Sequence, residues 1–152
     1  MDALSAVLTA APDGTLFAVC AGEPSVGFQA KTTARSADGG RSWAVRAPCG
    51  GKPCQGSPLD FGYLGAADAV SGSTVYLAGA RSPLLVTRDG GARWHVVRQV
   101  NAGTDAGTSQ VIFFSRADGV VLGQDSSDDE MPTLWRTADA GARWSAVHPL
   151  DG

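Results

Sequence analysis

The densest cluster of charge in this 152-residue chain is acidic. Asp125, Asp128, Asp129 and Glu130 lie close together in a single polar stretch. Clustered carboxylates are the ligands that hard cations such as Ca²⁺ prefer. Their spacing does not match an EF-hand loop, and an acidic loop of this kind is usually just solvated. The sequence therefore predicts no cofactor. The alternative is a calcium site, for which these four residues are the candidate ligands.

Three cysteines offer a second kind of chemistry. Cys49 and Cys54 are separated by a short Gly/Pro-containing segment, and no second pair completes a structural zinc site. A disulfide is the favoured interpretation, and three unpaired thiols are the alternative. Cys20 could bond to either Cys49 or Cys54. A loop of about 30 residues closed in this way would stabilise the fold by on the order of 3–4 kcal/mol in the chain-entropy model.

A short pattern occurs three times along the chain, and its residue types favour turns over catalysis. Each copy reads Ser/Thr-x-Asp-x-Gly-x-x-Trp, at a spacing of about 50 residues that is typical of a repeat architecture. The aspartate can accept hydrogen bonds from the N–H groups of its own turn, and the glycine can take a positive φ. The tryptophan then begins the next strand and buries a large apolar ring. The twelve positions are Ser36, Asp38, Gly40, Trp43, Thr87, Asp89, Gly91, Trp94, Thr137, Asp139, Gly141 and Trp144.

At these positions the chain resembles the BNR or Asp-box family of β-propellers. That family includes sialidases, sortilin-type receptor propellers, some xyloglucan-cleaving enzymes and a photosystem II assembly factor. The resemblance covers essentially the whole chain. It implies an all-β fold of three four-stranded antiparallel blades, each with an Asp-box turn, at about 3–48, 62–100 and 108–149.

The strand pattern agrees with four strands in each repeat, and no stretch shows a helical period. The strands expected are Leu4–Ala10, Thr15–Cys20, Ala30–Ser36 and Trp43–Ala47; then Tyr63–Val70, Thr74–Ala80, Leu84–Arg88 and Trp94–Val100; then Ser109–Ser115, Gly119–Gly123, Thr133–Thr137 and Trp144–His148.

Up-and-down connectivity separates the connections into two groups. The turns between first and second strands share one face with the motif turns. The long, varied loops share the other face, where binding residues are expected. Lys31 is expected near this second face, whereas Trp135 is expected to pack between blades. The candidate ligand residues of this face are Lys52, Tyr63, Arg81, Asp105 and Asp128.

The function predicted is a non-catalytic binding or scaffolding module for a protein or glycan ligand. The alternative is a fragment of a sialidase-like or other glycoside hydrolase propeller whose active site is incomplete in this chain. Glycoside hydrolysis needs two well-placed carboxylates. Asp60, Asp68 and Asp105 are the candidates, but nothing in the sequence supports a catalytic role for any of them. No catalytic residue is therefore assigned.

The overall composition excludes some classes of partner and location. A formal charge of −3 and the lack of a basic run argue against nucleic acid. No apolar segment reaches the roughly 18 residues of a membrane span. We expect a location outside the cytoplasm, although the apolar start of the chain lacks the basic region of a signal peptide. Since propellers close with four to eight blades, three blades predict further blades or a second copy that completes a ring.

Overall fold

The computed structural model describes residues 5–46, 57–60, 62–100, 107–124 and 132–147, and these form an all-β structure. Their strands make three antiparallel sheets of four, each with its strands in chain order. Sheet 1 comprises β1 (Ser5–Ala10), β2 (Leu16–Ala21), β3 (Lys31–Ser36) and β4 (Ala44–Val45); sheet 2 comprises β5 (Ala67–Ala69), β6 (Val75–Gly79), β7 (Ser82–Thr87) and β8 (His95–Val96); sheet 3 comprises β9 (Gly107–Phe113), β10 (Gly119–Gln124), β11 (Leu134–Thr137) and β12 (Ser145–Val147). One 3₁₀ turn, η1 (Pro58–Asp60), precedes sheet 2.

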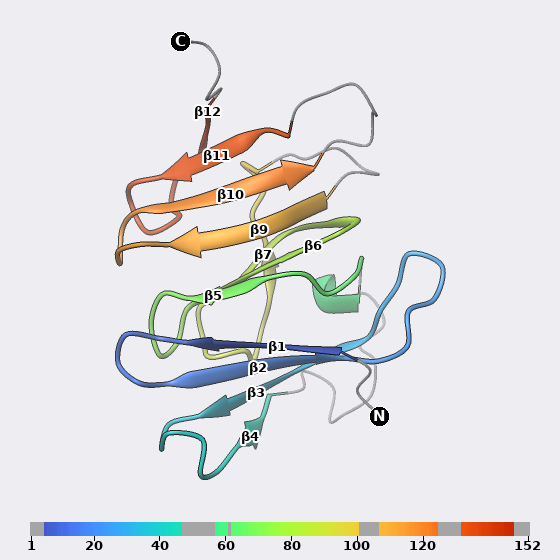
Figure 1. Cartoon of the computed structure of the whole chain (residues 1–152), viewed down its shortest axis with the longest axis vertical. Coiled ribbons are helices and arrows are strands. Elements are labelled where there is room, and N and C mark those ends of the chain that lie inside the picture. Colours follow the sequence, from blue (N-terminus) through green and yellow to red (C-terminus); the bar gives the residue numbers. More distant parts are fainter. Residues whose placement is uncertain (1–4, 47–56, 61, 101–106, 125–131, 148–152) are drawn as a thin grey trace.

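The three sheets lie side by side in chain order, with sheet 2 in the middle (Figure 1). The first strand of each sheet neighbours the first strand of the next, so that β1, β5 and β9 form a row. The motif turns and the turns after these first strands lie at one end of the sheets, which we call the turn face. In sheets 1 and 2 the connections between second and third strands lie at the opposite end, the loop face (Figure 1). This is the division that the connectivity predicts.

Most strands fall where the sequence places them, but the fourth strands of sheets 1 and 2 are much shorter than expected. The segment Trp94–Val100, for example, pairs only at His95 and Val96. The first strand of sheet 2 is also short, because a bulge interrupts it: the N–H groups of Gly65 and Ala66 both donate to the carbonyl of Ala78. Two consecutive donors on one acceptor break the regular ladder.

Burial along the second strands records which sheet faces are covered. All five residues of β6 are buried, because sheet 2 has a neighbour on each side. In β2 and β10 the burial alternates: Phe17, Val19 and Val121 are fully buried, whereas the residues between them are half-exposed. A strand with one covered face shows this period of two. Sheets 1 and 3 therefore each have one open face.

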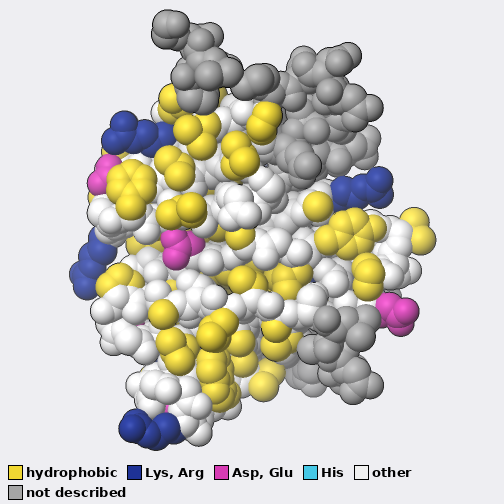
Figure 2. Space-filling model, in the orientation of Figure 1, with side chains coloured by type: hydrophobic (Ala, Val, Ile, Leu, Met, Phe, Trp, Pro, Cys, Tyr) yellow, Lys and Arg dark blue, Asp and Glu magenta, His cyan; other side chains and the backbone are white. Residues whose placement is uncertain are grey.

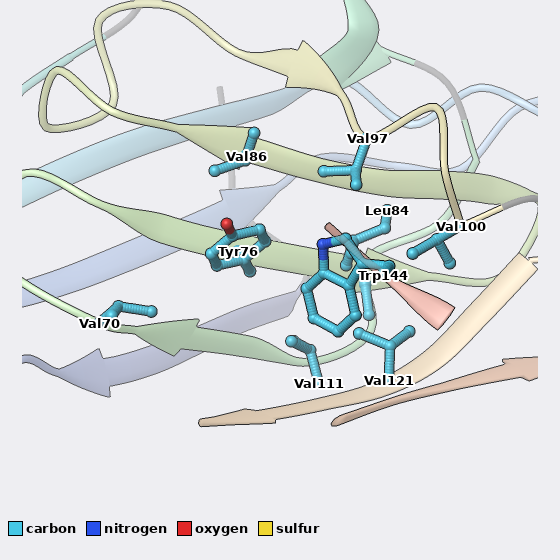
Figure 3. Close-up of a cluster of buried hydrophobic side chains, with 10 residues drawn as sticks. Val70, Tyr76, Leu84, Val86, Val97, Val100, Val111, Val121 and Trp144 are labelled. Carbon is cyan, nitrogen blue, oxygen red and sulfur yellow. The ribbon is translucent and has the colours of Figure 1, made fainter. Parts of the chain in front are cut away.

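Two apolar clusters fill the spaces between the sheets. The first junction, between sheets 1 and 2, contains Phe17 and Val19 opposite Leu77, Leu85 and Trp94. The second junction, between sheets 2 and 3, is built around Tyr76 and Trp144, with the members that Figure 3 labels: Val70, Leu84, Val86, Val97, Val100, Val111 and Val121. Tyr76 stacks on Phe113 at 4.8 Å between ring centroids. Trp135 packs against this cluster, as expected of a residue between blades.

Candidate binding surface on the loop face

The three motif turns share one local hydrogen-bond pattern. In each, the Ser/Thr hydroxyl accepts from the N–H of the motif glycine at 2.9 Å and donates to the aspartate. The aspartate also accepts from the N–H four residues later, at 2.8–2.9 Å. Each turn thus satisfies its own polar groups. The Ser/Thr hydroxyls and the aspartates are therefore occupied within the turns, whereas the indole N–H groups of Trp94 and Trp144 are buried without a hydrogen-bond partner among the described residues.

These hydrogen bonds lower the pKa of the motif aspartates. The hydroxyl and N–H of Ser42 and the hydroxyl of Ser36 lower the pKa of Asp38 to about 2. The N–H of Arg143 lowers the pKa of Asp139. For Asp89, burial raises the pKa, but the N–H of Arg93 and the hydroxyl of Thr87 outweigh it and the net shift is downward. The carboxylates are therefore held ionised as acceptors.

The motif tryptophans differ, and one expectation is wrong. Trp94 and Trp144 are 5% and 7% exposed, each packed against the sheet before its own, but Trp43 is 40% exposed. Within the described residues no sheet precedes sheet 1, so the Trp43 ring has no apolar surface to cover it. Its Nε1 donates to the carbonyl of Gly40 at 3.1 Å instead.

Two of the five expected ligand residues lie within the described part of the loop face. Tyr63 is half-buried and Arg81 is exposed. Lys52, Asp105 and Asp128 lie outside the described residues, as do the calcium candidates Asp125, Asp128, Asp129 and Glu130. No group of three or more metal-ligating side chains occurs in the part of the chain that the structure describes.

The expected disulfide is not formed at Cys20, which is a free cysteine. Cys20 lies on β2 with its side chain among those of the open face of sheet 1, so it points out of the first junction. Both proposed partners, Cys49 and Cys54, lie outside the described residues.

Lys31 is not available to an anionic ligand. Its side chain is buried at the start of β3, and its Nζ donates to the carbonyls of Gln29, Leu59 and Gly62 at 2.9–3.0 Å. Burial lowers the pKa of Lys31 to about 8, and the charge of Asp60 opposes that shift. Lys31 therefore joins the loop after β2 to the segment around η1, and its role is structural.

The nominated carboxylates have structural environments too. Burial raises the pKa of Asp60, and the Lys31 ammonium opposes this. Asp68 accepts the N–H of Phe113 and so joins β5 of sheet 2 to β9 of sheet 3. Asp105 lies outside the described residues.

The feature that sequence reasoning did not single out is a small hairpin in the loop between β2 and β3. Ser25 and Phe28 exchange both main-chain hydrogen bonds, at 2.8 and 2.6 Å, around the two-residue turn Val26-Gly27. Both turn residues have positive φ, 27° and 80°. This is the pattern of a primed hairpin turn, in which Asn-Gly is the usual pair. The sequence predicts only a loop here, between the expected strands Thr15–Cys20 and Ala30–Ser36.

Contacts from the segment before β5 hold the hairpin tip (residues 25–28) in place. The N–H of Gly27 donates to the Tyr63 hydroxyl at 3.1 Å, and its carbonyl accepts from the N–H of Gly62 at 2.9 Å. Despite these anchors, Val26 and Phe28 are 93% and 51% exposed. Figure 2 shows hydrophobic side chains gathered over this hairpin at the edge of the molecule. The hairpin tip is thus an apolar projection of the loop face whose backbone is fixed by hydrogen bonds to Gly62 and Tyr63.

A groove of about 350 Å³ lies elsewhere, at the outer rim of the second junction. Arg88, His95 and Arg98 line it together with the motif turn of sheet 3. His95 is exposed on β8, as expected of a surface residue. The groove is shallow and lies at the outer rim, away from the loop face.

Comparison with known proteins identifies the fold. No protein-family model matches the chain, and no curated protein matches it. Among solved structures, YCF48 bound to D1 peptide aligns with a TM-score of 0.51 and 21% identity over 87% of this chain. The GH74 enzyme of Niastella koreensis aligns with a TM-score of 0.58 and 14% identity over 94% of it. The chain spans only 36% and 22% of those two chains.

Both of these structures have propeller-type folds. Together with the three four-stranded sheets, the alignments confirm the predicted all-β propeller fold. At this level of identity the likeness extends to the fold alone. No helix among the described residues is long and apolar enough to cross a membrane.

Proposed function

We propose that this chain is a non-catalytic propeller module that binds a protein ligand, and that the hairpin tip is its contact point. On this proposal the three motif turns are Asp boxes that support the sheets, and the loop face is the recognition surface. YCF48, a structural neighbour, is a peptide-bound protein, which is consistent with a peptide ligand for this fold. The proposed location outside the cytoplasm is a separate prediction.

The observation that carries the proposal is Val26. A β-branched residue at positive φ is strained, and its side chain is 93% exposed, so packing within the chain does not offset the strain. Strain of this kind is concentrated at functional sites. Beside it, Phe28 presents an aromatic ring, the kind of side chain that anchors protein interfaces. Tyr63 fixes the backbone of both, which reduces the ordering cost of binding.

The test is selection of ligands from a random 12-residue peptide library displayed on phage, with the full chain immobilised. We expect the selected peptides to be rich in apolar residues. Their affinity should fall about tenfold or more in the variants Val26→Ser and Phe28→Ser. Val96→Ser is the matched control, because Val96 is also an exposed valine but lies at the rim on β8. Peptides that bind both hairpin variants normally would contradict the proposal.

Val26→Asn separates binding from folding. Asparagine tolerates positive φ and forms the favoured Asn-Gly turn. The variant should therefore raise the free energy of unfolding by about 0.5–1 kcal/mol while it weakens peptide binding. Weaker binding by a more stable protein cannot be explained by unfolding.

Two further measurements address the other predicted functions. A glycan array tests whether the module binds sugars. If the chain binds glycans and the phage library yields no peptide, the proposed ligand is a carbohydrate and not a protein. Hydrolysis of a fluorogenic sialoside or a xyloglucan oligosaccharide by the purified chain would overturn the non-catalytic assignment.

A further inference from the structure

The open faces of sheets 1 and 3 are apolar, and they are not equivalent. On sheet 1, Ala18 and Cys20 of β2 and Val45 of β4 lie on the open side together with Trp43. On sheet 3, Val120 and Leu122 of β10 lie on the open side, and so does Ile112 of β9, which is paired with Val120 and is 53% exposed. In Figure 2, hydrophobic side chains gather over sheet 1 at one end and over sheet 3 at the other.

The two internal junctions show what covers each kind of face. At both, a motif tryptophan enters the junction from the later sheet: Trp94 lies in the cluster with Phe17 and Val19 of β2, and Trp144 lies in the cluster with Tyr76 and Ala78 of β6. Trp43 is the third tryptophan of this set and has no such partner surface in the described structure.

The matching surface exists on sheet 3 of the same chain. Pairing with the motif residues Ser36, Thr87 and Thr137 aligns Leu16, Val75 and Gly119 as equivalent positions. One residue further on, Phe17 and Tyr76 receive a tryptophan, and the equivalent residue in sheet 3 is Val120. Two residues beyond these stand Val19, Ala78 and Leu122. The open face of sheet 3 is therefore a receiving face for a motif tryptophan.

The charges also fit a buried contact. The open side of sheet 1 carries no charged residue on the described parts of β1, β2 and β4. On the described strands of sheet 3, the charged residue on the open side is Arg136, which is paired with Val120 across the sheet and forms an ion pair with Asp118 at 3.7 Å. Closing the two faces together would therefore leave no charge buried without a partner.

We propose that a second copy of this chain covers these faces, head to tail: Trp43 of each copy enters the sheet 3 face of the other. One chain cannot join its own two faces because sheet 2 lies between them. Two identical contacts of this kind close a ring of six sheets, which is within the range of propellers. The contact continues the pattern of the internal junctions and is independent of the hairpin tip proposed as the ligand site.

The experiment is the solution mass of the full chain by light scattering over a dilution series. We expect twice the chain mass, with dissociation to a monomer on dilution. The variants Trp43→Arg and Ile112→Arg should each raise the dissociation constant about hundredfold or more. Both replaced side chains are substantially exposed, at 40% and 53%, so neither substitution disturbs the internal junctions.

Mixing the two variants gives the sharpest result. Trp43→Arg keeps an intact sheet 3 face, and Ile112→Arg keeps an intact sheet 1 face. The mixture should therefore form a dimer with one good contact, although each variant alone is monomeric. Such rescue also shows that both variants are folded. A self-complementary contact between two like faces predicts no rescue, and that result would overturn the head-to-tail proposal.

Phe28→Ser is the control, since it alters the hairpin tip and should leave the mass of the dimer unchanged. Conversely, Trp43→Arg should leave peptide binding by the hairpin tip unchanged, so the two proposals can fail separately. A wild-type chain that stays monomeric at every concentration would overturn the second copy as the occupant. A polydisperse wild-type sample would do the same and would point to other sheets on these faces.

Discussion

The main difference between the first motif turn and the other two is the exposure of its tryptophan. All three have the same hydrogen bonds between the Ser/Thr hydroxyl, the aspartate and the glycine N–H. Yet Trp43 is exposed, whereas Trp94 and Trp144 are buried against a preceding sheet. The turn is therefore a local structure that each repeat makes alone, and the tryptophan is a tertiary element that depends on a neighbour.

The largest effect should separate these two roles. Trp94→Ala removes a ring from the first junction and should lower the free energy of unfolding by about 3–5 kcal/mol. Trp43→Ala should cost less than about 1 kcal/mol when measured in dilute, monomeric protein, because its ring is largely in water. Denaturant unfolding measures both. Equal losses in the two variants would contradict the distinction.

A smaller effect is expected at the motif glycines, which share the same local geometry. Gly40 and Gly141 both have positive φ, 88° and 79°, so alanine adds a local strain of about 1–2 kcal/mol at each. At Gly141 the new Cβ would also collide with the Tyr76 hydroxyl, whereas at Gly40 the nearest atom is Leu16 Cδ1 at 3.5 Å. Gly141→Ala should therefore cost about 1–3 kcal/mol more than Gly40→Ala, by thermal or denaturant unfolding. A difference near zero would mean that the second junction yields to the added methyl group.

The link that Lys31 makes between the loop after β2 and the segment around η1 should give the stability a pH dependence. The pKa of Lys31, about 8 in the folded chain, lies below the ordinary value of 10.5, so the unfolded chain holds more protons between these values. The free energy of unfolding should therefore rise with pH in that window, by up to about 1.4 kcal/mol per pH unit. Below pH 8 this contribution is constant.

The chain contains one other lysine, Lys52, which provides the control. The rise should persist in Lys52→Met and vanish in Lys31→Met. Denaturant midpoints at several pH values from 7.5 to about 10 measure it. A rise that survives in Lys31→Met would assign the titration to another group.

The smallest effect concerns acid stability. The pKa of Asp38 is about 2, below the ordinary 3.8, so the ionised carboxylate stabilises the turn above about pH 4. This stability is lost as the pH falls through about 2. Asp139 shifts in the same direction but lacks the Ser42-type hydroxyl, because Arg143 stands in that place. NMR titration of the carboxyl groups should place Asp38 below Asp139, and Ser42→Ala should reduce the gap.

The sequence predicts the three sheets, but it does not predict the hairpin tip that we propose as the ligand contact. The Ser/Thr-x-Asp-x-Gly-x-x-Trp repeat encodes a local turn, so its three occurrences were enough to predict three four-stranded sheets. The burial of Lys31 depends on carbonyls of Gln29, Leu59 and Gly62, which the fold brings together from distant segments. The exposure of Trp43 depends on a neighbour that the motif itself does not contain.

The hairpin tip escaped prediction for a related reason. Val26-Gly27 is not a typical primed-turn pair, since valine is disfavoured at positive φ. What holds it there is the Tyr63 hydroxyl on a segment far along the chain. Tyr63 itself remains a predicted ligand residue, and its hydroxyl accepts the N–H of Gly27 in the tip.

The short fourth strands limit how this molecule can misassemble. β4 and β8 have two residues each and β12 has three, so the outer edge of every sheet offers few unpaired N–H and C=O groups. Long, flat edges recruit strands from other chains and seed amyloid-like stacking, whereas edges this short give an incoming strand little to pair with. Overproduction or partial unfolding should therefore yield amorphous aggregates that form through the exposed apolar sheet faces. Little fibre that binds thioflavin T is expected.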